Sequence, residues 1–138
     1  MNNRIEILPK EVQRVLDVVK TKTNKQIIIL PRDIETGKNP REFMVEVGID
    51  YGEAYNIIRS LSIEDYKECI LDQVHNYICL YVFKRYINDI SSYIKIGFLH
   101  DIKSGDVHVV SFHRDMMLME EKNYEDNKEE GNSRSKRN

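Results

Sequence analysis

The sequence has few cysteines, no long apolar run and no large excess of either charge. Cys69 and Cys79 are the two cysteines among 138 residues, and their spacing fits neither the disulfide framework of a secreted domain nor a metal site. We expect both to be free, buried thiols in a reducing cytoplasm. The longest early apolar stretch, 27–30, is far too short to cross a membrane, and no signal peptide is evident. We therefore expect a cytoplasmic protein without a membrane partner.

The balance of charge limits the possible partners. The net charge is −2, and acids and bases nearly cancel both in the body, 1–119, and in the final segment, 120–138. Proteins that bind nucleic acid non-specifically usually have a strongly basic surface, because phosphate contacts dominate their affinity. Any contact with RNA must therefore be local. The sequence predicts a single folded domain over 1–119, followed by a disordered charged tail over 120–138.

Hydrophobic spacing predicts a helix and then a strand in the first quarter of the chain. Apolar residues recur at the three-and-four spacing of an amphipathic helix over 9–23. Three consecutive isoleucines within 26–30 indicate a short buried strand that Pro31 ends. In the polar loop that follows, the glycine and lysine of 36–38 could approach a phosphate. Because the spacing of a phosphate-binding motif is missing, we expect a plain surface loop there.

Three helix starts follow in quick succession. Asn39 and Asp50 are capping residues in front of apolar helical patterns. The first of these helices should end at Gly48, since glycine suits the left-handed stop of a helix. Ser62 marks the third start and is predicted to begin a short helix or helical turn that reaches about residue 70.

The second half of the chain is predicted to form three antiparallel strands. Residues 77–86 are apolar on both faces, which favours a central strand. Asn88 and Asp89 then mark a turn, and two further strands surround a second turn within 93–113. A last short helix or loop is predicted over 115–119. This order indicates an α+β fold, with a small antiparallel sheet and helices packed on one side.

Alternation along the last two strands places their polar side chains on a common face. The economical pairing buries five apolar side chains together: Ile94, Ile96, Phe98, Val110 and Phe112. The opposite face then holds Tyr93, Lys95, Ser111 and His113. If the turn at Asn88-Asp89 is tight, Lys84 lies opposite Tyr93 and joins them. Such a face is either a catalytic site or an ordinary solvated sheet surface, and the pattern alone leaves both open.

The side chains of this face suit metal-free cleavage of RNA by its own 2′-hydroxyl. The sequence shows neither the carboxylate pair of a glycosidase nor the acidic cluster of a Mg²⁺-dependent nuclease. His113 can act as an acid or a base near neutral pH, and Tyr93 can hold the phosphate. Lys84, Lys95 or Arg85 can supply positive charge to the phosphate oxygens. We therefore expect no metal and no cofactor.

Five short motifs follow one another along the chain: TGKN at 36–39, SLSIEDY at 60–66, LYVFK at 80–84, YIKI at 93–96 and VVSFH at 109–113. In this order they resemble the MqsR-type toxins, which are RelE-like ribonuclease toxins of bacterial toxin–antitoxin pairs. The similarity covers roughly residues 10 to 117. Each motif is short and largely apolar, so the ordered set is what supports the resemblance.

The resemblance implies a RelE-like fold and a sequence-selective endoribonuclease that cleaves single-stranded mRNA without a metal. It also implies a cognate antitoxin protein that holds the enzyme inactive. Tyr93 matches the tyrosine that opens the family's Tyr-aliphatic-Lys strand, and His113 stands where the prototype has lysine after Ser-Phe. A family lysine is matched by Lys67 when one residue is gapped. The prototype's active-site glutamine aligns with Leu80, which is a departure from the family pattern.

The sequence therefore predicts the toxin of a type II toxin–antitoxin system, with His113 as general acid or base and Tyr93 orienting the phosphate. Lys84 and Lys67 are predicted to stabilise the charge of the phosphate. Further contacts with RNA are predicted for Lys95, Arg85 and Ser111. Because Leu80 cannot hydrogen-bond, an alternative remains open: a non-catalytic module on the same fold that binds RNA or protein.

Overall fold

A computed structural model describes residues 3–72 and 75–116 of the chain. Its elements follow in the order β1 (Arg4–Ile5), α1 (Pro9–Val19), a 3₁₀ turn (Asn24–Gln26), β2 (Ile27–Ile29), α2 (Pro40–Val47), α3 (Tyr51–Arg59), a 3₁₀ turn (Ile63–Asp65), β3 (Tyr66–Ile70), β4 (Leu80–Ile87), β5 (Ile90–Gly97) and β6 (Val107–Arg114). The predicted tail, 120–138, and most of the segment predicted as a last helix or loop, 115–119, lie outside the described residues.

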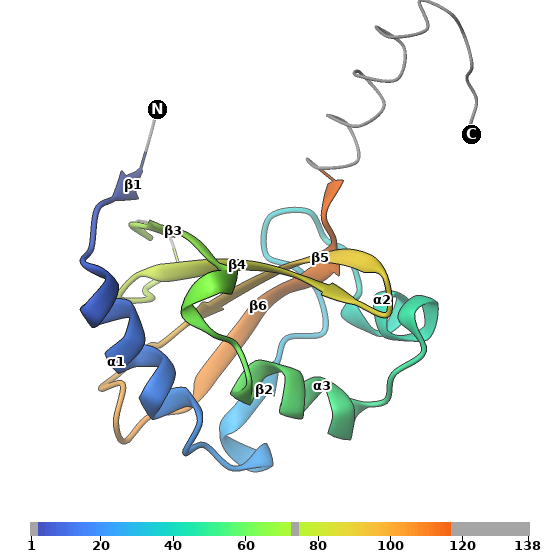
Figure 1. Ribbon diagram of the computed structural model, residues 1–138, viewed down its shortest axis with the longest axis horizontal. Coiled ribbons are helices and arrows are strands. Elements are labelled where there is room, and N and C mark those ends of the chain that lie inside the picture. The colour runs from blue at the N-terminus through green and yellow to red at the C-terminus, as the bar shows by residue number, and fades with distance from the viewer. Residues whose placement is uncertain (1–2, 73–74, 117–138) are drawn as a thin grey trace, which may run out of the picture.

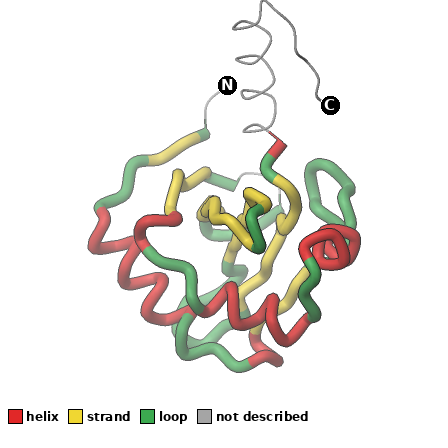
Figure 2. The backbone as a smooth tube through the Cα atoms, turned by 45° about the vertical axis from the view of Figure 1, so that its right-hand side comes forward, coloured by secondary structure: helices red, strands yellow, loops and turns green. Residues whose placement is uncertain are grey.

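The strands form one six-stranded sheet in the order β1-β3-β4-β5-β6-β2. β2 runs parallel to β6, and every other neighbouring pair is antiparallel. In Figure 1, α1 and α3 lie below the strands and α2 lies at one end of them, while Figure 2 shows the helical segments curving round one side of the sheet. The predicted α+β class is confirmed, although the sheet is mixed rather than purely antiparallel. Within the described residues, none of the helices is long and apolar enough to cross a membrane.

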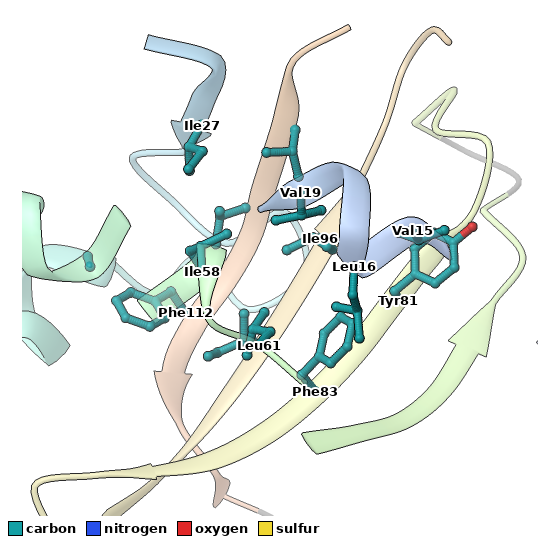
Figure 3. Close-up of a cluster of buried hydrophobic side chains, with 14 of the residues drawn as sticks. Val15, Leu16, Val19, Ile27, Ile58, Leu61, Tyr81, Phe83, Ile96 and Phe112 are labelled. Atoms are coloured by element: carbon teal, nitrogen blue, oxygen red, sulfur yellow. The ribbon is translucent and has the colours of Figure 1, made fainter. Parts of the chain in front are cut away.

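The main hydrophobic core fills the space between the sheet and the helices (Figure 3). Leu16 of α1 and Ile58 of α3 point toward the apolar face of the strands, where Phe83 lies. On the side of α2, Phe43 meets Phe112 of β6 edge to face, with ring centres 5.4 Å apart. Full burial of a side chain of this size contributes about 1.5–3 kcal/mol to stability. This core therefore fixes which face of the sheet is turned away from the helices.

The helices begin and end close to where their capping residues predict. The side chains of Asn39 and Asp50 each accept a backbone N–H of the following first turn at 2.8 Å. α2 ends at Gly48, whose φ of 78° is left-handed. α1 ends at Val19 rather than at residue 23.

The prediction of a third helix that reaches residue 70 is wrong. After the 3₁₀ turn Ile63–Asp65, the chain forms β3, which pairs with β4. Tyr66 packs edge to face on Phe83 of β4, with ring centres 5.8 Å apart. A five-residue segment is too short to sustain a helix by itself, whereas β4 supplies strand partners for four of its five residues. Tertiary pairing therefore overrides the local capping signal.

A tight turn fixes the register of β4 and β5. Asn88 and Asp89 both have positive φ angles, 48° and 71°, which these two residue types tolerate. The adjacent residues Ile87 and Ile90 pair, and so does every residue of the two strands as far as Leu80 and Gly97. The predicted tight turn is confirmed.

A β-bulge in β6 changes which residues of that strand are buried together. The register shifts after the Lys95–Ser111 pair, which leaves Val110 as an extra residue. Val109 therefore joins Phe112 in the main core, whereas Val110 lies in a second, smaller buried cluster. That cluster also contains Tyr77 and Leu80. The prediction that Val110 is buried with Phe112 is wrong, because it assumed unbroken alternation along the strand.

Candidate functional site

Three side chains from adjacent strands line up across the face of the sheet that is turned away from the core. Lys84 on β4 pairs with Tyr93 on β5, and Tyr93 pairs with His113 on β6. We call these three residues the row. Two residues further along β5, Lys95 pairs with Ser111. The structure thus brings together the five residues that alternation and the tight turn predict on one face.

The rings of Tyr93 and His113 are stacked. Their centres lie 5.2 Å apart and their planes differ by 16°. Burial, reinforced by the nearby carboxylates of Glu35 and Glu68, raises the pKa of Tyr93 well above its ordinary value. The phenol therefore keeps its proton at neutral pH and can donate a hydrogen bond. The ammonium of Lys95 lies 5.7 Å from the centre of the Tyr93 ring, within the range of a cation–π contact.

A loop covers this face over β5 and β6. The loop, residues 30–39, connects β2 to α2 and rises on the side of the sheet away from α1 and α3 (cyan in Figure 1). Asp33 Oδ2 lies 3.2 Å from His113 Nε2, and Glu35 Oε1 lies 3.0 Å from Lys95 Nζ. Lys95 is 1% exposed and His113 9%. The face is therefore neither an open cleft nor a solvated sheet surface.

Asp33 fixes the path of the loop. Its Oδ1 accepts the backbone N–H of Glu35 at 2.7 Å and that of Thr36 at 2.9 Å. The backbone N–H of Asp33 donates to the carbonyl of Lys38 at 2.8 Å, and Gly37 closes the turn with a left-handed φ of 73°. An aspartate that bonds the backbone two and three residues ahead is a recurrent way of tightening a turn. The loop is therefore built around one carboxylate that also reaches the sheet.

The surroundings of Asp33 keep its carboxyl group ionised. Burial raises the pKa, but the nearby Ser111 hydroxyl, the backbone N–H groups of Thr36 and Glu35 and the charge of His113 outweigh it, so the pKa lies below its ordinary value. The Ser111 hydroxyl is buried and near the carboxylate, yet it does not reach hydrogen-bonding geometry with any described residue. Asp33 thus presents a negative charge from the loop to the face of the sheet at His113.

Both ring nitrogens of His113 face hydrogen-bond acceptors. Nδ1 lies 2.9 Å from the backbone carbonyl oxygen of Arg114, and Nε2 faces Asp33. A neutral imidazole has a single N–H, so the protonated ring is the form that donates to both acceptors at once. In this arrangement neither nitrogen of His113 is open to a substrate.

Lys84 marks the part of the face that the loop leaves more open. Its side chain is 28% exposed, and its ammonium lies 3.4 Å from Oδ1 of the buried Asp115 at the end of β6. Lys84, Lys95 and His113 therefore each have a carboxylate neighbour. Of the cations that the sequence predicts for this face, Lys84 and Lys95 are present, and each of them is paired with a carboxylate.

The structure does not bring Arg85 or Lys67 to the row. Arg85 follows Lys84 on β4, so it points to the other face, where it donates to Ser60 Oγ at 2.6 Å and pairs with Asp65 at 3.4 Å. Lys67 is exposed at an irregularity in the β3–β4 register. Among the described residues it has no hydrogen bond and no ion pair with the row.

A second histidine–tyrosine pair lies further along the same face. The hydroxyl of Tyr77 is 2.9 Å from His108 Nδ1, and burial lowers the pKa of His108 although Asp106 opposes the shift. His108 pairs with Gly97 of β5. A Cβ at Gly97 would lie 2.8 Å from Leu80 Cδ2 and 2.9 Å from Tyr77 Cδ1, so the missing side chain makes room for this pair.

Cys69 and Cys79 are both free thiols, as predicted, and they lie close together where β3 meets the start of β4. Cys69 is buried, but the prediction that Cys79 is also buried is wrong, because Cys79 lies just before β4 and is partly exposed. The Cys69 thiol, as hydrogen-bond donor, lowers the pKa of Cys79 although burial opposes the shift. The same contact, together with burial, raises the pKa of Cys69. Cys79 is therefore the more reactive of the two.

Sequence reasoning missed the carboxylates that face the cations, namely Asp33, Glu35 and Asp115. A local signal existed for Asp33, since an aspartate three residues before Thr36-Gly37 is typical of a side-chain-closed turn. No local signal places the loop on the sheet, because Glu35 and Lys95 are 60 residues apart in the sequence.

The described residues, 3–72 and 75–116, contain no group of three His, Cys, Asp or Glu side chains that could hold a metal ion. The carboxylates on this face instead lie singly against Lys84, Lys95 and His113. Comparison of the chain with protein-family models, with curated proteins and with solved structures finds no match.

Proposed function

We propose that the chain is a metal-free endoribonuclease whose active site is the row Lys84–Tyr93–His113. The row is the observation on which the proposal rests: an imidazole, a neutral phenol and an ammonium from three neighbouring strands stand side by side. They can supply an acid or base, a hydrogen-bond donor and a positive charge to the cleavage of a phosphodiester without a metal. Lys95, one pair further along, adds a second ammonium beside the phenol.

The proposed reaction uses the 2′-hydroxyl of the substrate as nucleophile. A bond forms between the 2′-oxygen and phosphorus, the bond from phosphorus to the 5′-oxygen breaks, and one proton leaves the 2′-hydroxyl while another reaches the leaving oxygen. Nε2 of His113 takes or gives one of these protons and solvent water exchanges the other, while Nδ1 stays bonded to the Arg114 carbonyl. Lys84 and Lys95 stabilise the charge that develops on the phosphate oxygens, and Tyr93 donates a hydrogen bond to one of these oxygens.

The same proposal includes the biological role of a type II toxin with a RelE-like fold, held inactive by a cognate antitoxin and acting on single-stranded mRNA. Its support is the resemblance to the MqsR-type toxins, whose five motifs lie in the loop before α2, in the segment that leads into β3, and in β4, β5 and β6. The near-neutral body fits an enzyme that grips a few nucleotides rather than a duplex. Lys67 and Arg85 are left out of the proposed site, because neither has a contact with the row in the described part of the chain.

A second candidate function is a non-catalytic module that binds RNA or protein. Two observations favour it. Leu80, at the position of the prototype's glutamine, is buried in the small apolar cluster with Tyr77 and Val110 and offers no hydrogen-bonding group. In addition, Lys84, Lys95 and His113 each already have a carboxylate neighbour. A module of this kind would bind its partner without cleaving it.

Cleavage of a fluorescent single-stranded RNA, in the presence of EDTA, separates the two functions. We expect the wild type to cleave the RNA and His113→Ala to cleave it roughly 10²- to 10⁴-fold more slowly, the usual contribution of a general acid or base. His100→Ala is the matched control, since His100 is exposed and lies in the connection between β5 and β6, outside the row. RNA with 2′-methoxy groups should remain intact, because it lacks the nucleophile.

Expression in growing cells provides a second readout. The wild type should arrest growth and fragment RNA, and His113→Ala should do neither. Growth arrest with intact RNA would favour the binding module. Equal cleavage by the wild type and His113→Ala, or cleavage of the 2′-methoxy RNA, would be incompatible with the catalytic assignment.

A further inference from the structure

The loop over the sheet places two carboxylates against an imidazole and an ammonium in a regular way. Asp33 and Glu35 are two residues apart in the loop, and their partners His113 and Lys95 are on adjacent strands. Each carboxylate of the loop therefore has its own nitrogen partner on the sheet. An RNA strand is also a chain of evenly spaced single negative charges.

The position of Asp33 coincides with the atom that the proposed reaction needs. Nδ1 of His113 is held by the Arg114 carbonyl, so Nε2 is the nitrogen that can exchange a proton with a substrate, and Asp33 lies against it. Lys95 is 1% exposed, and its hydrogen bond runs to the Glu35 carboxylate. In this conformation the two carboxylates occupy the places where phosphate oxygens and the reacting groups would have to lie.

The two carboxylates are held to very different extents. The Asp33 side chain is 3% exposed and is tied by two backbone N–H groups of its own loop. The Glu35 side chain is 64% exposed and bonds to Lys95. Rotation of the Glu35 side chain about its own bonds breaks that contact without any change in the backbone of the loop. Glu35 is therefore the part of the cover that an incoming anion can displace first.

We propose that Lys95 and His113 form a phosphate-binding subsite for single-stranded RNA, which the Glu35 and Asp33 carboxylates occupy in the resting protein. RNA binds by displacing Glu35 from Lys95 and then Asp33 from His113, so residues 30–39 are an autoinhibitory strap. One phosphodiester replaces one carboxylate at Lys95, so the buried ammonium stays neutralised throughout. The inference extends the proposed function, since it names the ligand and the internal control of the same site.

Binding of an RNA that cannot be cleaved tests the subsite independently of catalysis. The probe is a fluorescein-labelled single-stranded oligonucleotide with 2′-methoxy groups at every position, and its dissociation constant is measured by fluorescence anisotropy at low salt. Glu35→Gln keeps an oxygen for Lys95 but removes the competing charge. We expect it to bind the probe roughly three- to tenfold more tightly than the wild type, because the binding-competent form becomes more populated.

Glu42→Gln is the matched control, because Glu42 is exposed on α2 and its substitution changes the net charge by the same amount. A gain in affinity with Glu35→Gln that Glu42→Gln does not show supports the strap. An equal gain in both variants, or none in either, overturns it. The variant Glu35→Gln with Lys95→Met should lose the gain, and a gain that survives without Lys95 also overturns the proposal.

A chemical readout does not depend on RNA. Acetylation of amines followed by mass spectrometry should modify Lys95 slowly in the wild type and at least about threefold faster in Glu35→Ala, because the Glu35 side chain then no longer covers the Lys95 ammonium. An unchanged rate would contradict the displaceable cover. If the wild type does not cleave RNA but both readouts hold, the subsite stands and the catalytic proposal falls. If the wild type cleaves RNA but neither readout changes, the catalytic proposal stands and the subsite proposal falls.

Discussion

Replacing Asp33 by asparagine tests whether the charge of one carboxylate holds the loop on the sheet. Asparagine keeps the shape and an acceptor oxygen for the backbone N–H groups of Glu35 and Thr36, but it removes the negative charge 3.2 Å from His113. A hydrogen bond to a charged group contributes about 1.5–3 kcal/mol. Loss of one partner of a buried ion pair can cost about 3–5 kcal/mol, but a neutral His113 can accept a hydrogen bond from the new amide. We therefore expect a loss of about 2 kcal/mol in the free energy of unfolding at neutral pH.

The pH dependence of this loss gives an independent check. Because the folded-state pKa of Asp33 is lowered, its carboxylate stabilises the fold above the unfolded-state pKa of about 3.9. This contribution is lost as the pH falls through that value toward the folded-state pKa. The difference in stability between the wild type and Asp33→Asn should therefore be smaller below about pH 4 than at neutral pH.

Urea unfolding followed by circular dichroism at about pH 7 and about pH 3.5 measures both quantities. Asp89→Asn is the matched control, because Asp89 is exposed and asparagine tolerates its positive φ. We expect this control to change stability by less than about 0.5 kcal/mol. If Asp33→Asn loses the same stability at both pH values, or none at about pH 7, the pairing with His113 does not hold the loop in the way described.

Three further substitutions or reactions test other parts of the structure. Phe112→Ala should lower the free energy of unfolding by about 3–5 kcal/mol, measured by urea unfolding, because it removes a buried ring that packs on α2. Gly97→Ala should cost about 1–3 kcal/mol in the same assay, since the added Cβ collides with side chains of the neighbouring segment. Iodoacetamide at neutral pH should alkylate Cys79 before Cys69, as peptide mass spectrometry can follow, because Cys79 is more exposed and has the lowered pKa.

Each of these three results has an internal comparison. Tyr86 is 67% exposed, so Tyr86→Ala should leave stability nearly unchanged, and a cost similar to that of Phe112→Ala would contradict the description of the core. A Gly97→Ala variant as stable as the wild type would show that the Tyr77–His108 pair does not depend on that space. Equal rates of alkylation at the two thiols would contradict the prediction that Cys79 is more reactive than Cys69.

The alignment of the row was predictable because it depends on short-range rules. The Asn88-Asp89 turn is tight, so counting outward from it places Lys84 opposite Tyr93. Side-chain alternation then fixes which residues share that face. The capping residues of α2 and α3 work in the same way, since their partners lie within one turn of helix.

The bulge in β6, the strand β3 and the position of the loop were not predictable, since they depend on contacts between distant parts of the chain. The bulge at Val110 adds a residue to β6 without any residue type that marks it, so a strict alternation rule fails there. Likewise β3 is recognisable as a strand once β4 is known to lie beside it. The position of the loop follows from ion pairs with residues that come 60 or more positions later.

The pairing of β2 with β6 at the edge of the sheet has a consequence for the rate at which solvent can reach the face under the loop. β2 is a three-residue strand at the edge of the sheet, whereas β3 to β6 form a continuous meander of longer strands. Short edge strands open by local unfolding at a small fraction of the global free energy. The loop begins where β2 ends, with the Leu30 N–H bonded to the Val109 carbonyl at 3.1 Å. Opening of this edge would lift one end of the loop while the meander stays folded, so the lifetime of a few backbone hydrogen bonds would set how often the buried histidine meets solvent.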